Sequence, residues 1–405
     1  MLTELNKHIL EQASKFDTFY LYNEKQILES IDRIKQNFPD IDFLYSIKCN
    51  SNPHVLSTVF SHGLEADAAS KGEVLISCEV GLPKEKIYYS APGKTISDIE
   101  QTITKSILIA DSIDEILRIE SIAKRMNIQV SIGIRLNPNF TFYSDRGNLS
   151  KFGIDEDQAI AFIKNTTLQN TKINGIHVHL KSQELNPHVL SKYYTRMLLL
   201  AEEWESLTGG LSFLNLGSGF GVPQRSNDTS LDLSILSSEI NPQFKKFKEK
   251  HPNTRIIIET GRYVVCKSGY YIMKVLDRKV SMGKIFIIIK NTLNGFIRPS
   301  IAELIKKYAS EDDPAGTEPL FTASNAFQFF TLKDDKPSET VSLVGNLCTA
   351  ADVVAEDILM PHLEYGDVIG ITNAGAYAAV LSPMQFSSQE KPVELFLTSD
   401  GCIKQ

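Results

Sequence analysis

The chain has 405 residues, of which 42% are hydrophobic and 22% charged, as in an ordinary soluble globular protein. Its net charge of −7 argues against a surface for nucleic acid or for an anionic membrane. No apolar run approaches the roughly 20 residues of a membrane span. The five cysteines are scattered without a CxxC pair, and the first residues lack the layout of a signal peptide. These features predict a cytoplasmic protein without a metal site.

The first part of the chain alternates between strand-like and helical patterns. A short β-prone run at 18–22 precedes a helix over 24–37. Stretches of helical periodicity, such as 113–125 and 193–207, separate most of the β-prone runs that follow. Those runs cover 43–48, 64–69, 87–91, 107–111, 129–137, 173–180, 213–219 and 255–261. Eight strands alternating with helices predict an α/β fold with a closed (β/α)8 barrel, and an open doubly wound sheet is the alternative.

The pattern changes after residue 261, where strands dominate. They are predicted at 270–276, 284–290, 339–347, 367–372 and 393–397, with one helical piece near 301–309 and a loop at 310–319. This indicates a β-rich second domain, which the early strand at 18–22 can join. We therefore predict a barrel over 24–268, and a second domain built from 1–23 and 269–405.

Chemically suggestive side chains lie at the carboxyl ends of the predicted strands, which share one rim of a barrel. They are Lys48, Asp67, Ser70, Arg135, His177, His179, the loop Gly217-Ser-Gly-Phe-Gly221, and Glu259 with Arg262. Lys48 is either a surface charge or an amine in a pocket. In a pocket, burial would lower its pKa and free the nitrogen to attack an aldehyde.

Each of the other candidates also has a structural alternative. The glycines could form only a flexible turn, or they could let backbone N–H groups approach a phosphate. His179 could be a core histidine or could stack on an aromatic cofactor. Glu259 could pair with Arg262 or hold a pyridine nitrogen in its protonated state. Asp67 and Arg135 could form a structural ion pair. Taken together, the amine, the glycine loop, the histidine and the carboxylate are the parts that pyridoxal phosphate requires.

The chain resembles the fold-type III pyridoxal-phosphate decarboxylases, the group of diaminopimelate, ornithine and arginine decarboxylases. The resemblance spans nearly the whole sequence. Its motifs are Tyr45-Ser-Ile-Lys48, Asp67-Ala-Ala-Ser-Lys-Gly-Glu73, Ser150-Lys-Phe-Gly153, His177-Val-His179, Gly217-Ser-Gly219, Glu259-Thr-Gly-Arg262, Val344-Gly-Asn-Leu-Cys348 and Ala374-Gly-Ala-Tyr377. It implies an alanine-racemase-like barrel, a β-sandwich-like or barrel-like second domain, and a homodimer whose active sites are shared at the interface.

The resemblance also implies roles for individual residues. Lys48 would hold the cofactor covalently, His179 would stack on its ring, and Glu259 would hold the pyridine nitrogen. Cys348 would reach in from the partner subunit as the proton donor after CO₂ departs. The cofactor site would further include Asp67, Arg135, Ser182, Gly217, Ser218, Gly219, Gly261, Arg262 and Tyr377. Arg298, Thr349 and Asp352 would face the substrate.

Within this family the sequence is most similar to siderophore-pathway decarboxylases that act on a citryl-diaminopropionate conjugate. Thr349 follows Cys348 where diaminopimelate and ornithine decarboxylases have an acidic residue that reads a distal ammonium. Lys181 replaces the usual glycine between His179 and Ser182. An acylated substrate rich in carboxylates is therefore expected, with Arg298 on a distal carboxylate and Lys181 as a further contact. Diaminopimelate, another basic amino acid and a carrier-bound amino acid remain alternatives.

Two other functions fit parts of the pattern. An amino-acid racemase on a related barrel needs a second base, usually a tyrosine, and the Cys348 motif fits protonation from one side better. A non-catalytic binding protein of the same fold would have no need to retain Lys48, Glu259 and Cys348 together.

Overall fold

The computed structural model describes residues 3–224, 228–308, 326–333 and 338–405. The chain forms two compact units. One comprises Ile31–Val222 and Ser230–Gly261, and the other comprises Met1–Ser30, Pro223–Thr229 and Arg262–Gln405. The loop predicted at 310–319 lies outside the described residues. The predicted domain limits at 24 and 268 stay a prediction.

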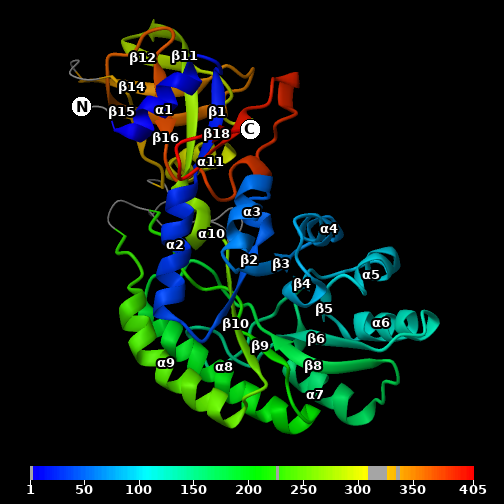
Figure 1. The fold of residues 1–405 in the computed structure, drawn as a ribbon. Coiled ribbons are helices and arrows are strands. Elements are labelled where there is room, and N and C mark those ends of the chain that lie inside the picture. Colours follow the sequence, from blue (N-terminus) through cyan, green and yellow to red (C-terminus); the bar gives the residue numbers. More distant parts are fainter. Residues whose placement is uncertain (1–2, 225–227, 309–325, 334–337) are drawn as a thin grey trace. The chain divides into compact units, whose positions relative to one another are not determined.

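The first unit contains a closed barrel of eight parallel strands (Figure 1). The strands are β2 (Asp42–Ser46), β3 (Glu65–Ala68), β4 (Ile87–Tyr89), β5 (Ile107–Ala110), β6 (Val130–Asn137), β8 (Thr171–His177), β9 (Phe213–Asn215) and β10 (Arg255–Thr260). Pairing runs in the order β5-β4-β3-β2-β10-β9-β8-β6, and a β5–β6 ladder closes the ring. The predicted barrel is confirmed and the open sheet is excluded. The short β7 (Ile154–Asp155) pairs with β6.

Helices alternate with the barrel strands as the sequence predicts, the first preceding β2 and the others each following a strand. They are α2 (Glu24–Asn37), α3 (Pro53–Ser61), α4 (Lys71–Glu79), α5 (Ile96–Thr102), α6 (Ile113–Arg125), α7 (Glu156–Asn165), α8 (Pro187–Thr208) and α9 (Leu233–Lys250). Local sequence sets their ends. Asn186 caps α8 by accepting from His188 N–H, Pro187 occupies the first turn, and Gly209 ends the helix in the left-handed conformation.

The barrel interior is filled by one layer of large apolar side chains. Leu44, Tyr88, Ile109, Phe213 and Ile257 form this core cluster. The glycines of β6 and β8 make room for it, because a Cβ at position 175 would lie 2.1 Å from Cζ of Phe213. The barrel is therefore a packed core, and its chemistry must lie at its carboxyl rim.

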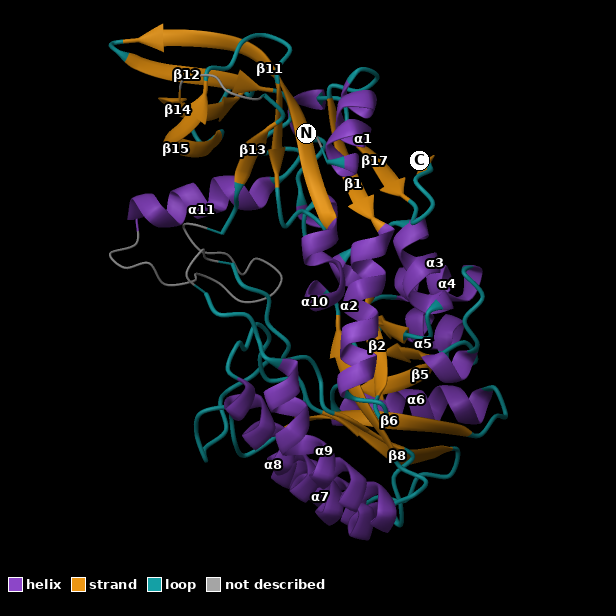
Figure 2. Cartoon of the chain, turned by 60° about the vertical axis from the view of Figure 1, so that its left-hand side comes forward, coloured by secondary structure: helices purple, strands orange, loops and turns teal. Residues whose placement is uncertain are grey.

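The second unit is a mixed nine-stranded sheet, whose long β11–β12 hairpin is clear in Figure 2. Its strands are β1 (Thr18–Asn23), β11 (Gly269–Ser281), β12 (Lys284–Ile289), β13 (Phe329–Thr331), β14 (Ser338–Gly345), β15 (Val353–Pro361), β16 (Val368–Ile371), β17 (Val393–Leu397) and β18 (Ile403–Lys404). β1 pairs with β11 and β17, which confirms that the early strand joins this sheet.

Besides the first residues of α2, the described part of the second unit contains the α-helices α1 (Glu4–Ala13), α10 (Arg262–Val265) and α11 (Ile297–Tyr308). Ile9 of α1 packs with Phe19, Leu21 and Ile272 in the core of the sheet. Neither β13 nor β15 was predicted from the sequence. In β15 the charged pair Glu356-Asp357 interrupts the apolar alternation, and Asp357 has a φ of 53° where the register shifts. No helix in the described parts of either unit is long and apolar enough to cross a membrane.

Candidate active site

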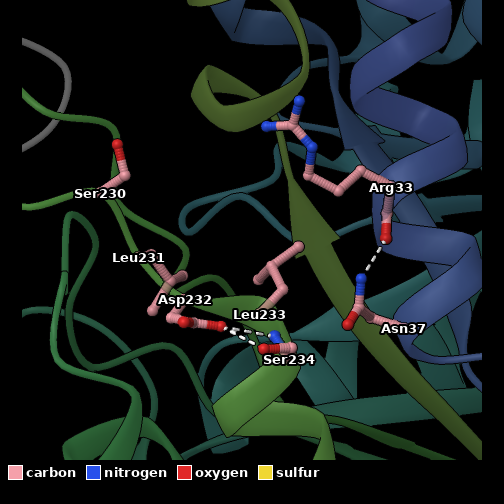
Figure 3. A pocket seen from close by; sticks show the side chains of 7 residues that line it. All are labelled: Arg33, Asn37, Ser230, Leu231, Asp232, Leu233 and Ser234. Carbon is pink, nitrogen blue, oxygen red and sulfur yellow. Dashed lines mark hydrogen bonds between the residues drawn. The ribbon is translucent and has the colours of Figure 1, made fainter.

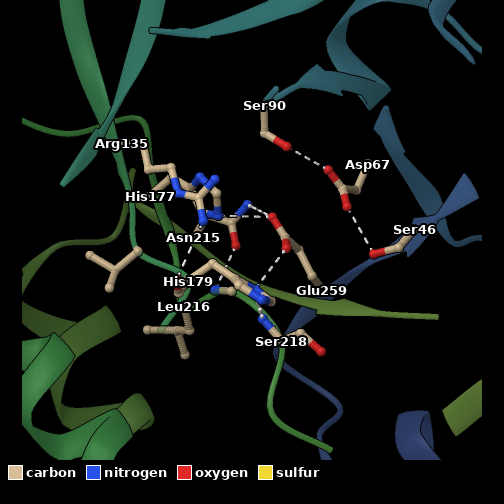
Figure 4. A network of polar contacts seen from close by, with 12 residues as sticks. Ser46, Asp67, Ser90, Arg135, His177, His179, Asn215, Leu216, Ser218 and Glu259 are labelled. Carbon is tan, nitrogen blue, oxygen red and sulfur yellow. Dashed lines mark hydrogen bonds and ion pairs between the residues drawn. The ribbon is translucent and has the colours of Figure 1, made fainter. Parts of the chain in front are cut away.

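Eight buried polar side chains, one from each barrel strand or the residue after it, form a layer at the carboxyl rim, and Figure 4 labels all of them except Asp111. Side chains alternate along a strand, so a residue two positions beyond an inward-facing one also faces inward. Five members follow a side chain of the interior cluster by two positions, and Asp67, Arg135 and His177 follow Glu65, Gly133 and Gly175 by two. The members are Ser46, Asp67, Ser90, Asp111, Arg135, His177, Asn215 and Glu259.

Asp67 is fully buried, and its carboxylate is saturated by neighbours. Ser46 Oγ donates to Oδ2 at 2.8 Å, and Ser90 Oγ donates to Oδ1 at 2.7 Å. Lys48 Nζ lies 3.1 Å from Oδ2. A buried carboxylate is tolerated when it is paired and hydrogen-bonded in this way, so Asp67 is a fixed negative charge beside the lysine.

Lys48 lies in a 3₁₀ turn (Ile47–Cys49) directly after β2, and its side chain keeps 41% of its exposure. Burial acts to lower the pKa of its amine, but the carboxylates of Asp67 and Glu259 outweigh burial and raise that pKa above its usual value. Burial thus acts in the direction that the sequence analysis expected, but the net effect is a raised pKa for Lys48. The physical reason is that Asp67 reaches it from the neighbouring strand and stabilises the ammonium.

Glu259 is 2% exposed and its two oxygens have different surroundings. Oε1 accepts a hydrogen bond from Asn215 Nδ2 at 3.0 Å, and it lies 3.1 Å from His177 Nε2. Oε2 lies 3.5 Å from His179 Nδ1. Burial would raise the pKa of this carboxyl, but the charge and hydrogen bonding of His177 outweigh burial and hold the pKa well below its usual range. Glu259 is therefore a buried carboxylate.

His179 lies in the loop after β8, two residues past the strand end. Ser218 N–H donates to its Nδ1 at 3.1 Å, and Ser182 Oγ lies 3.5 Å from Nε2. Because Nδ1 accepts a hydrogen bond, the neutral ring carries its proton on Nε2. Burial lowers the pKa of His179, which favours this neutral form. The ring is thus held by the backbone of the glycine loop.

Close packing against backbone or side chains leaves little room for a Cβ at the glycines of this rim. Gly217 has a φ of +68°, and a Cβ there would lie 2.3 Å from Val178 O. A Cβ at Gly219 would lie 2.6 Å from Leu190 Cδ2, and one at Gly261 would lie 2.2 Å from Cys49 Sγ. Packing therefore explains these glycines, and their role beside a phosphate stays a prediction.

Arg135 is buried at the end of β6 and does not take Asp67 as its ion-pair partner. Its Nη1 lies 3.8 Å from Asp111 Oδ1, and its guanidinium lies 4.4 Å from the ring centroid of Phe152. Arg135 Nη2 also donates to His179 O at 3.4 Å. The Ser150-Lys-Phe-Gly153 motif thus supplies the ring under this arginine.

The second unit brings together Arg262 and Tyr377, two residues of the predicted cofactor site. The Arg262 guanidinium lies 4.7 Å from the ring centroid of Tyr377, and both residues are buried. Tyr377 has a φ of +51°, which is uncommon for a bulky residue. Such backbone conformations cluster at functional sites.

The loop 346–352 of the same unit carries Cys348, which is exposed, and Thr349, which is half-buried. Asp352 is buried and fixes this loop from inside. Its Oδ1 accepts from the Thr292 hydroxyl and, at 3.1 Å, from Leu293 N–H, while its Oδ2 accepts from Leu347 N–H at 2.9 Å. The prediction that Asp352 contacts the substrate therefore receives no support from these bonds.

Arg298 is fully buried in the second unit. Its Nη1 donates to Ala376 O and its Nη2 to Gln224 Oε1, each at 3.1 Å. Its guanidinium also lies 5.2 Å from the ring centroid of Phe327. Its predicted contact with a substrate carboxylate stays a prediction.

Sequence reasoning missed several members of the polar layer, namely Ser46, Ser90, Asp111 and Asn215. The available signal was a polar residue two positions beyond an inward apolar one, as in Phe213-Leu-Asn215. A surface depression between α2 and α9, lined by 33, 37 and 230–234, contains none of these residues (Figure 3). There Asp232 accepts from Ser234 and Ile235 N–H groups and caps α9.

The barrel residues fit pyridoxal phosphate by the chemistry of their groups. Glu259 is an ionised carboxylate whose Oε2 has no hydrogen bond from Asn215 or His177. His179 presents a neutral ring beside Oε2, and Lys48 supplies an amine from the same rim. A buried carboxylate suits a pyridinium nitrogen, and an amine suits an aldehyde.

Comparisons with known proteins agree with this fit. The sequence profile described as "Pyridoxal-dependent decarboxylase, pyridoxal binding domain" matches residues 24–266. The L-glutamyl-[BtrI acyl-carrier protein] decarboxylase of Niallia circulans is 29% identical over 397 residues, covering 95% of this chain and 89% of that protein. The diaminopimelate decarboxylase of Helicobacter pylori strain J99 is 29% identical over 392 residues, covering 94% and 90%.

A solved structure is also similar. The crystal structure of diaminopimelate decarboxylase from Helicobacter pylori complexed with L-lysine has a TM-score of 0.79 and 27% sequence identity, covering 96% of this chain and 92% of that one.

Proposed function

The chain belongs to the family of pyridoxal-dependent decarboxylases, and from this premise we propose that it decarboxylates an amino acid conjugated to a polycarboxylate, with citryl-diaminopropionate as the leading candidate. Its cofactor is pyridoxal phosphate, and it is a carboxy-lyase that acts on an amino acid. The finer proposal concerns the substrate and the roles of individual residues. A siderophore pathway is where such a conjugate would be consumed.

The bound cofactor supplies an electron sink for the bond that breaks at the α-carbon. The chain's own groups have separate tasks in this proposal. Lys48 offers the amine that attaches the cofactor, and Glu259 holds the ring nitrogen through Oε2. His179 covers the ring as a neutral imidazole, and Cys348 delivers a proton to the α-carbon after CO₂ leaves. The ionised state of Glu259 and the neutral state of His179 support these assignments.

The observation that carries the substrate proposal is that the described loop 346–352 offers no free carboxylate to bind a distal ammonium group of the substrate. Its one acidic side chain, Asp352, is buried and accepts three hydrogen bonds from Thr292, Leu293 and Leu347. Thr349, beside Cys348, carries no charge. A lysine or ornithine tail would desolvate a cation here without a partner, which is costly, whereas an acylated amine has no charge to desolvate.

Two cations favour a conjugate with additional carboxylates. The buried Arg298 presents a guanidinium fork, and a substrate carboxylate would bind it by replacing Gln224 as its partner. Lys181 lies in the loop after β8, where its Nζ contacts Tyr143 Oη at 2.6 Å and Glu184 Oε2 at 3.4 Å. Because Glu184 already balances the charge of Lys181, we expect Lys181 to contribute less than Arg298 to binding of the substrate carboxylate.

A carrier-bound amino acid is the second candidate. It is favoured by the Niallia circulans relative, whose name specifies a glutamyl group on an acyl-carrier protein. Such a substrate also has no free distal ammonium, so the uncharged Thr349 accommodates both.

Competition assays separate these substrates. We expect CO₂ release from the citryl conjugate to exceed release from free lysine, ornithine and meso-diaminopimelate at equal concentration. Faster release from any free amino acid would refute the conjugate proposal and leave the family assignment intact. Faster release from a glutamyl-carrier protein would select the second candidate.

We further propose a homodimer in which each active site takes Lys48 from one chain and Cys348 from the other. The exposure of Cys348 in the single chain supports this arrangement.

A further inference from the structure

The two oxygens of Glu259 are held so differently that their roles can be separated. We propose that His177 and Asn215 are positioning residues that occupy Oε1, fix the rotation of the carboxylate, and reserve Oε2 for the ring nitrogen of the cofactor. This rests on the proposed role of Glu259, and it adds a function for two residues that do not touch the reacting atoms.

The positions of the two residues follow from the barrel register. His177 and Asn215 are aligned partners on the parallel strands β8 and β9, so their side chains project to the same side of the sheet. Both are buried, with 1% and 0% exposure. Glu259 comes from the adjacent strand β10, and its N–H donates to Gly217 O at 3.0 Å, which fixes its backbone. An amide donor from β9 and an imidazole nitrogen from β8 thus converge on one oxygen.

Asn215 has a second contact that links the carboxylate to the rest of the site. Its Oδ1 accepts from Gly217 N–H at 2.9 Å while its Nδ2 donates to Glu259. The next residue, Ser218, donates its N–H to His179. Glu259, the glycine loop and the His179 ring therefore form one hydrogen-bonded unit, visible in Figure 4, with Asn215 at its centre.

His177 can donate Nε2–H to Oε1 both as a cation and as one neutral tautomer. Neither ring nitrogen makes a hydrogen bond among the described residues, and the ring's closest polar contact is the ion pair of its Nε2 with Glu259 Oε1 at 3.1 Å. The other titratable groups that face this region are Lys48, Asp67, Asp111, Arg135 and His179, and the charge of Glu259 raises the pKa values of Lys48, Arg135 and His179 against the effect of their burial. An uncompensated buried carboxylate takes up a proton readily, and the donors on Oε1 oppose this.

The test uses the holoenzyme and a spectroscopic readout. In His177→Leu and Asn215→Leu we expect the pH at which the absorption band of the bound cofactor changes to move relative to the parent. Turnover should fall by about 10–100-fold, the usual effect of removing a group that orients a ligand, and kcat should change more than KM. His177→Gln retains an N–H donor and should restore much of the loss. Asn174→Leu is the control, because Asn174 lies on β8 and its amide donates to Ser212 Oγ instead.

Three outcomes are decisive. Folded leucine variants with the parental band, pH profile and kcat would overturn the proposal. If Glu259→Gln also leaves the band and turnover unchanged, the proposed role of Glu259 itself fails, and this outcome distinguishes the two claims. If the leucine variants do not fold, ¹⁵N NMR of the unmodified apoprotein decides: we expect a proton on His177 Nε2, and a deprotonated Nε2 would overturn the proposal.

Discussion

Lys48 and Asp67 form an ion pair at the carboxyl rim of the barrel, with Nζ 3.1 Å from Oδ2. Asp67 also accepts from Ser46 and Ser90, so it is a fully satisfied anion with no exposure. The pair stabilises the ammonium form of Lys48 before any aldehyde arrives. An ammonium has no lone pair for attack, so proton loss from Lys48 must precede attachment of the cofactor.

This relationship predicts that the apoprotein takes up pyridoxal phosphate faster as the pH rises. The amine must lose its proton, and Asp67 and Glu259 raise its pKa. In Asp67→Asn the midpoint of the uptake rate against pH should move down by about one unit or more, since one neighbouring charge is removed. Ser90→Ala removes a hydrogen bond but keeps the charge and should move it far less. Stopped-flow absorbance measures the rates, and equal midpoints in the parent and Asp67→Asn would contradict the account.

Cys348→Ala should keep the cofactor and lose turnover. If Cys348 donates a proton to the α-carbon, its removal should slow CO₂-coupled product formation by about 10²–10⁴-fold, the usual range for general acid catalysis. The parental cofactor spectrum should remain. Cys402→Ala is the matched control, since Cys402 is also a free exposed thiol. If Cys348→Ala turns over as fast as the parent, the thiol has no part in the reaction.

A mixture of two inactive variants tests whether active sites are shared. We expect Lys48→Ala chains and Cys348→Ala chains, unfolded and refolded together, to regain part of the parental activity. Each mixed dimer would contain one site with both residues intact. Activity no greater than the sum of the separate variants would rule out sites built from two chains.

Glu73 should make the free energy of unfolding depend on pH in a specific window. Burial raises the pKa of this carboxyl from 4.5 to about 7. Between pH 4.5 and about pH 7 the folded state keeps the Glu73 proton that the unfolded state releases. The contribution of Glu73 to the free energy of unfolding is therefore complete below pH 4.5 and is lost as the pH rises through about 7. The effect is at most about 3 kcal/mol, and less because the side chain is partly exposed.

Glu73→Gln removes this dependence while its amide oxygen can still accept from Ala69 N–H, which now donates to Oε2 at 2.6 Å. Urea unfolding at about pH 5 and about pH 8 measures the difference between parent and variant. Glu79→Gln at the other, exposed end of α4 is the control. A parent and Glu73→Gln variant with parallel pH curves would show that the raised pKa is absent.

Gly217→Ala tests the close packing of the glycine loop. A φ of +68° costs a non-glycine residue roughly 1–2 kcal/mol, and the overlap with Val178 O at 2.3 Å adds about 1–3 kcal/mol. Gly93→Ala is matched for conformation, with a φ of +70°, but a Cβ there meets nothing within 4 Å. Denaturant unfolding should therefore show the larger loss for Gly217→Ala. Equal losses would mean that the loop has room and the glycine is needed for conformation alone.

Much of the barrel was predictable because its strands are short apolar runs that alternate with amphipathic helices. The polar layer was harder to predict. Asn215 and Ser90 carry no local signal of function, and their partners Glu259 and Asp67 become neighbours only when the barrel closes in one register. The same holds for Lys48, whose pKa depends on a carboxylate 19 residues further along the chain. Strand β15 was missed because Glu356 and Asp357 interrupt its pattern.

We propose that Lys48 attaches the cofactor at the rim of the barrel. The most direct measurement is to incubate the protein with pyridoxal phosphate, reduce it with borohydride, digest it, and locate the modified residue by mass spectrometry. The account predicts one stoichiometric modification on Lys48, with buried Lys94 and surface Lys181 unmodified. Stoichiometric labelling of a different lysine, or sustained CO₂ release from a Lys48→Ala variant, would contradict it.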